Sequence, residues 1–127
     1  MDDPINPKHY AGRACADIGE RLSANGYQIL KYCWRLGRKD EPVVELGKAA
    51  WYADSEAKLI AVMDKLYPNV KTQPFARDLA DPVSFLRERI ADQPPFTQLI
   101  ACALWGGYGV REIQSIIELI ETERASL

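Results

Sequence analysis

The sequence predicts an all-α fold: a small helical domain with a long central helix and a C-terminal αα-hairpin. Apolar residues recur at steps of three and four along much of the chain, which is the period of an amphipathic helix. No segment alternates apolar and polar residues for long, so strands are not expected. Prolines and glycines separate the periodic segments and mark where helices begin and end.

The N-terminal part is predicted to hold an extended arm and two helices. Residues 1–11 are expected to be the arm, because Pro4 and Pro7 fix φ and disfavour helix just before them. A short helix is expected over residues 14–22. After the break "SANG", a second helix should run over residues 27–37.

The central helix is predicted to span residues 42–66. Asp40 is a plausible N-cap, and Pro42 suits the first turn of a helix. The apolar positions follow the helical period, and the alanines among them allow a neighbouring helix to approach closely. These positions are Leu46, Ala49, Ala50, Ala53, Ala57, Ile60 and Met63.

The C-terminal third should contain a short helix over residues 82–91 and then a helical hairpin. The turn "GGYG", residues 106–109, joins two apolar stripes. We therefore divide the chain into a core, residues 1–72, and a helical extension, residues 73–127, that forms a homo-oligomer. The oligomer prediction rests on the second stripe: Ile113, Ile116, Ile117 and Ile120.

Composition excludes several classes of protein. The chain has 127 residues, 47% hydrophobic and 27% charged, and a net charge of -2, which argues against general nucleic-acid binding. Three scattered cysteines and a single histidine give no zinc-site spacing, so reduced thiols in the cytoplasm are expected. The proline-broken, acidic N-terminus is not a signal peptide, and "LIACALWGGYGV" is too short to span a membrane.

The stretch "GYQILKYCWRLGRKD", residues 26–40, points to an anionic, flat ligand. On a helix, Lys31, Arg35 and Arg38 line one face without acidic partners in that helix. Tyr32 and Trp34 flank these cations. Arginine suits phosphate, and a flat ring suits a base, so a nucleotide would satisfy both groups.

Two further segments carry similar chemistry. In "KAAWYAD", Lys48 and Tyr52 share a helical face, with Trp51 beside them. We expect the two aromatic residues to pack partly against the second helix. In "NPKHY", His9 and Tyr10 lie on the arm, and a histidine there can contact phosphate or transfer a proton.

The order of these blocks resembles a family of small, mostly phage-encoded proteins, catalogued as a domain of unknown function and often labelled nucleotide kinase. The likeness covers about residues 6–60, through "NPKHY", "ACADIGERL", "NGYQILKYCWRLGRKD" and "ELGKAAWYAD". Asn25-Gly26 reverses the family's order, and Ala14 replaces an acid, which favours binding over catalysis. The motif positions are His9, Tyr10, Lys31, Tyr32, Trp34, Arg35, Lys48, Trp51 and Tyr52.

The resemblance implies a helical protein that handles a nucleotide in an infected host cell. Three hypotheses stay open. The first is a kinase of nucleoside monophosphates without a Walker loop, which would need Mg²⁺ together with Arg or Lys. The second is sequestration of a nucleotide, including a host signalling nucleotide used in defence. The third is a structural or partner-binding helical oligomer. The candidate ligand-binding residues are those motif positions together with Arg38; no metal ligands are predicted.

Overall fold

A computed structural model of the chain describes residues 7–127, with side chains from Arg13 onward. Six helices occupy this described range, which confirms the all-α prediction. Thr72 and Tyr108 form an isolated antiparallel bridge. The helices are α1 (Pro7–Gly19), α2 (Ala24–Trp34), α3 (Pro42–Leu66), α4 (Pro82–Ile90), α5 (Pro95–Trp105) and α6 (Val110–Ala125).

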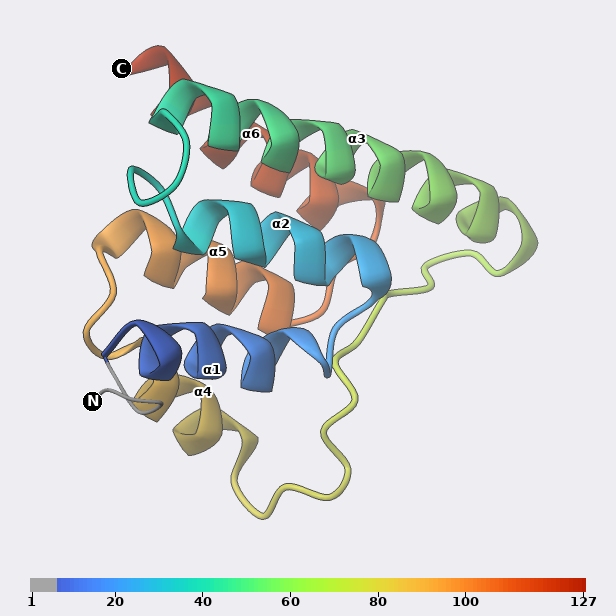
Figure 1. The fold of residues 1–127 in the computed structure, drawn as a ribbon. Helices are drawn as coiled ribbons and strands as arrows, with labels where there is room; N and C mark the ends of the chain where they lie inside the picture. The colour runs from blue at the N-terminus through green and yellow to red at the C-terminus, as the bar shows by residue number, and fades with distance from the viewer. Residues whose placement is uncertain (1–6) are drawn as a thin grey trace.

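The helices pack in pairs that join the two halves of the chain (Figure 1). Helix α4 lies against α1, α5 against α2 and α6 against α3, while α2 also packs between α1 and α3. The C-terminal helices therefore cover the N-terminal ones directly. Residues 73–127 supply part of the same core that residues 1–72 begin.

The core takes up the apolar stripe on which the oligomer prediction rested. Ile113, Ile116 and Ile120 of α6 are at most 1% exposed and belong to the same buried cluster as Leu46 and Ala53 of α3. The stripe is therefore used within the chain. A homo-oligomer through these helices stays a prediction without that support.

Helix α1 corrects the predicted arm. It begins at Pro7, so residues 7–11 are helical. Proline suits the first turn of a helix because its N–H would have no partner there and its φ is already helical. Residues 1–6, the rest of the predicted arm, lie outside the described range.

Helix α2 begins and ends three residues earlier than predicted. Ser23 is its N-cap, with a side-chain oxygen that accepts a hydrogen bond from the Gly26 N–H. The helix ends at Trp34, because Arg35 adopts φ −101° and ψ 24° and Gly37 takes a positive φ of 73°. Residues 35–38 form a turn that reverses the chain toward α3.

The bounds of α3 agree with the prediction. Pro42 stands in its first turn, but the N-cap is Glu41 and not Asp40. Its buried face runs from Leu46 through Ala49 and Ala53 to Ile60 and packs against both α2 and α6. In the described part of the chain, no helix is long and apolar enough to cross a membrane.

Candidate functional site: cations around Tyr32

Three cations surround the ring of Tyr32 on α2. Lys31 Nζ and the guanidinium carbon of Arg35 each lie 4.8 Å from the ring centroid, and Lys48 Nζ lies 5.4 Å from it. Lys48 comes from α3, so the cluster bridges the two helices. The negative face of an aromatic ring attracts cations at such distances.

Aromatic rings continue this cluster along α3. Tyr32 stacks on Tyr52, with centroids 5.9 Å apart and an interplanar angle of 15°. Trp51 meets Tyr52 edge to face at 5.0 Å and is 64% exposed. The predicted packing of Tyr52 against the second helix is confirmed, whereas Trp51 offers its indole ring to solvent.

Carboxylates from the start of α3 pair with two of the cations. Arg35 Nε donates to Glu45 Oε2 at 2.8 Å, and the Glu45 side chain is 0% exposed. Lys48 Nζ donates to Asp40 at 3.0 Å and lies 3.6 Å from Glu45 Oε1. The anions that pair with this cationic stripe therefore come from outside its helix: Glu45 lies on α3, and Asp40 lies two residues before α3 begins.

The pair of Lys48 and Asp40 favours the charged form of both groups. The hydrogen bond from Lys48 is the main cause that lowers the pKa of Asp40, and the same bond raises the pKa of Lys48. Arg35 uses Nε for Glu45, and its two terminal nitrogens donate no hydrogen bond to a described residue. Glu45 thus fixes the plane of a guanidinium whose outer edge can still meet an oxyanion.

Two predicted ligand residues lie apart from this cluster. Trp34 is 5% exposed in the hydrophobic core, so its ring has no open face for a base. Arg38 is exposed beyond the end of α2, so it does not continue the helical stripe of Lys31 and Arg35. The side chains of His9 and Tyr10 lie outside the described residues.

A buried polar cluster, which sequence reasoning missed, fixes the other end of α2. Glu56 of α3 is 4% exposed, and its Oε2 accepts hydrogen bonds from Ser23 Oγ at 2.6 Å and from the Tyr108 hydroxyl at 2.5 Å. Asn25 donates to Glu56 Oε1 at 3.2 Å. Burial, and then the bond to Glu56, raises the pKa of Tyr108. The sequence held one sign of this cluster: Glu56 is an acid placed among the alanines of the buried face of α3.

Three carboxylates that could in principle hold a magnesium ion are used in ion pairs. Asp17 pairs with Arg89, Asp40 with Lys48 and Glu45 with Arg35. Across the described residues, no cluster of three or more His, Cys, Asp or Glu side chains could hold a metal ion. The described donors therefore do not fit a magnesium site built from these side chains alone.

Comparison with protein-family models, with curated proteins and with solved structures finds no match to this chain.

Proposed function

We propose that the chain binds a nucleotide on the surface where Lys31, Arg35 and Lys48 surround Tyr32. The observation that carries this proposal is the convergence of three cations, from α2, the turn after it and α3, on one ring that is itself stacked on Tyr52. Phosphate requires cationic donors, and a base requires an exposed flat ring. Both kinds of group meet here.

The contacts of this surface suggest a division of roles. Lys31 and the terminal nitrogens of Arg35 meet the phosphate, because Glu45 already holds Arg35 through its Nε. Trp51, which is largely exposed and touches Tyr52 by an edge, stacks on the base. Lys48 is shared between Asp40 and Glu45 and therefore keeps the surface in shape.

We propose that the chain binds the nucleotide and does not transfer its phosphoryl group. The family resemblance favours nucleotide handling, and alanine at position 14 favours binding over phosphoryl transfer. A kinase must also hold Mg²⁺ beside the transferred phosphoryl group. The carboxylates beside Lys31 and Arg35 are instead paired with the cations themselves.

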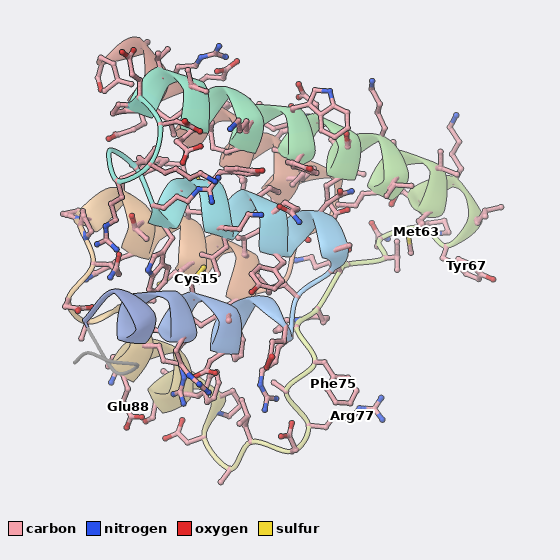
Figure 2. The ribbon with its side chains drawn as sticks, viewed as in Figure 1. Cys15, Met63, Tyr67, Phe75, Arg77 and Glu88 are labelled. Carbon is pink, nitrogen blue, oxygen red and sulfur yellow. The ribbon has the colours of Figure 1, made fainter. Side chains whose placement is uncertain are left out.

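The test is calorimetric titration of the purified chain with nucleoside mono-, di- and triphosphates and cyclic dinucleotides, with and without Mg²⁺. Lys31→Ala should weaken binding about tenfold, the loss of one charge-assisted contact. Tyr32→Leu should also weaken binding, because it removes the ring around which the three cations gather. Tyr32→Phe keeps that ring and should bind like the parent chain. Arg77→Ala is the matched control, because Arg77 is exposed on the segment between α3 and α4 (Figure 2).

Mass analysis of the ligand after denaturation separates binding from catalysis. A nucleotide returned unchanged supports the proposal, and a converted nucleotide would replace it with the kinase hypothesis. If no nucleotide binds, or if Arg77→Ala weakens binding as much as Lys31→Ala, the proposal is wrong.

A further inference from the structure

Helix α3 carries a second apolar face that the chain leaves uncovered. Val44, Trp51, Leu59, Val62 and Leu66 recur at helical spacing and are 45–70% exposed, with Lys48 and Ser55 as the polar positions on the same face. The opposite face, with Leu46, Ala53 and Ile60, is the one buried against α2 and α6. A helix that is apolar on both faces is typical of an element covered on both sides.

The C-terminal end of α3 extends this face beyond the rest of the molecule. Figure 1 shows its last turns passing the ends of α2 and α6, and Ile60 is its last buried residue. Met63 and Tyr67 lie at this free end (Figure 2), where both are exposed. Single exposed apolar residues are normal, but a continuous stripe of them marks a surface for a partner.

We propose that this face is a homodimer interface in which α3 pairs antiparallel with α3 of a second copy, about a two-fold axis at Ser55. The stripe is symmetric in sequence about that residue. Val44 and Leu66 are equally distant from Ser55, and so are Trp51 and Leu59. A two-fold interface must be complementary to itself. This register sets Val44 against Leu66 and Trp51 against Leu59. It also sets Val62 against Lys48, whose aliphatic stem can cover it.

The position of the axis fits a close helix crossing. Ser55 is a small residue, and its hydroxyl donates to the Trp51 carbonyl oxygen of its own helix at 3.1 Å. It therefore needs no polar partner from outside. A small side chain at the crossing lets two helices approach, with the larger residues packing on either side.

The charges beside the stripe are also self-complementary. Asp54 and Lys58 are exposed and lie on the same flank of the apolar face. In an antiparallel pair, like flanks face each other, so Asp54 lies beside Lys58 of the partner subunit and the reverse pair forms by symmetry. This arrangement distinguishes a second copy from an unrelated apolar partner.

The dimer would place the two candidate nucleotide surfaces on either side of the axis. Trp51 belongs to both features, since its edge touches Tyr52 and its position in the stripe faces Leu59 of the partner subunit. The second copy would thus form one wall of the surface around Trp51. The dimer itself does not depend on nucleotide binding.

The first experiment is analytical ultracentrifugation of the full chain over a range of concentrations. We expect a monomer–dimer equilibrium that Leu59→Glu shifts toward monomer by at least about tenfold in the dissociation constant, because the charge would face Trp51 of the partner subunit. The control is Leu99→Glu on α5, since Leu99 is also 55% exposed and lines an apolar groove of about 640 Å³ between α5 and α6. Circular dichroism confirms that both variants fold.

The second experiment tests the register. In a Cys102→Ser background, which removes the exposed native thiol, Ser55→Cys should form a disulfide-linked dimer on mild oxidation. Arg77→Cys, on the segment before α4, should not. A chain that stays monomeric, a dimer broken by Leu99→Glu but not by Leu59→Glu, or cross-linking of Arg77→Cys in preference to Ser55→Cys would each overturn the proposal.

Discussion

Glu45 on α3 and Arg35 just after α2 form an ion pair in which the carboxylate is completely buried and the guanidinium is partly exposed. The Nε–Oε2 distance is 2.8 Å, and the pair spans the turn that reverses the chain between the two helices. A buried carboxylate is costly without a partner. The pair therefore contributes to the stability of the turn as well as to the orientation of Arg35.

Arg35→Ala should destabilise the fold, because it leaves Glu45 buried with only Lys48 nearby, 3.6 Å from the other oxygen. We expect the free energy of unfolding to fall by about 3 kcal/mol, measured by urea denaturation. Arg38→Ala removes an exposed arginine from the same turn and should change the free energy of unfolding by less than about 0.5 kcal/mol. Equal effects of the two variants would contradict the role given to Glu45.

Tyr108→Phe should destabilise the fold while keeping the ring in place. The variant removes one of the donors to the buried Oε2 of Glu56. The expected loss is about 1–3 kcal/mol in the free energy of unfolding. Tyr67→Phe is the matched control, since Tyr67 is 68% exposed and should tolerate the change. A neutral Tyr108→Phe would mean that the hydroxyl contributes nothing to the cluster.

Stability should fall in acid, in part because of Asp78. Its bidentate hydrogen bonds with Arg21 hold the carboxyl pKa below its ordinary value of 3.8. A lowered pKa in the folded state means that the pair stabilises fully above the unfolded value, and that this contribution is lost as the pH falls through the folded value.

The measurement is urea denaturation over a series of pH values below neutrality. Asp78→Asn should flatten the decline in unfolding free energy at acidic pH relative to the parent chain. Glu118→Gln removes an exposed carboxylate with no ion pair to a described residue, and it should leave the decline nearly unchanged. If Asp78→Asn follows the parent curve at every pH, Arg21 and Asp78 do not interact in solution.

The three thiols should react at very different rates. Burial raises the pKa of the Cys15 thiol to about 12 and also raises the pKa of Cys33, whereas Cys102 is exposed. Because the thiolate is the reactive species, alkylation of the folded chain should modify Cys102 first. Peptide mapping by mass spectrometry would locate the label. Early modification of Cys15 or Cys33 would show that the region around α2 opens easily.

The sequence predicted α3 well because its signals agree. Proline in the first turn and small or apolar residues at helical spacing point to the same element, and the bounds are correct. The predicted arm was wrong over residues 7–11, because one of its prolines is compatible with two different structures. Pro7 disfavours helix before it but is well suited to begin one, and only the packing of α1 on α2 decides between them.

The candidate site was predictable in composition but not in pairing. Tyr32, Tyr52 and the surrounding cations could be chosen by residue type and helical face. Arg35 and Glu45, however, meet across a turn, and no spacing rule gives that contact. Trp34 was misjudged because an aromatic residue suits both a base and a core; with Ile29, Leu30 and Cys33 also buried, it continues the core face of α2.

The pairing of α1 with α4, α2 with α5 and α3 with α6 has a consequence for synthesis. When the first three helices leave the ribosome, the helices that cover them have not yet been made. Ile120, which is fully buried, belongs to α6, so the core closes only after this helix has emerged. Until then the nascent chain exposes the apolar faces of the first three helices, which are surface that chaperones bind.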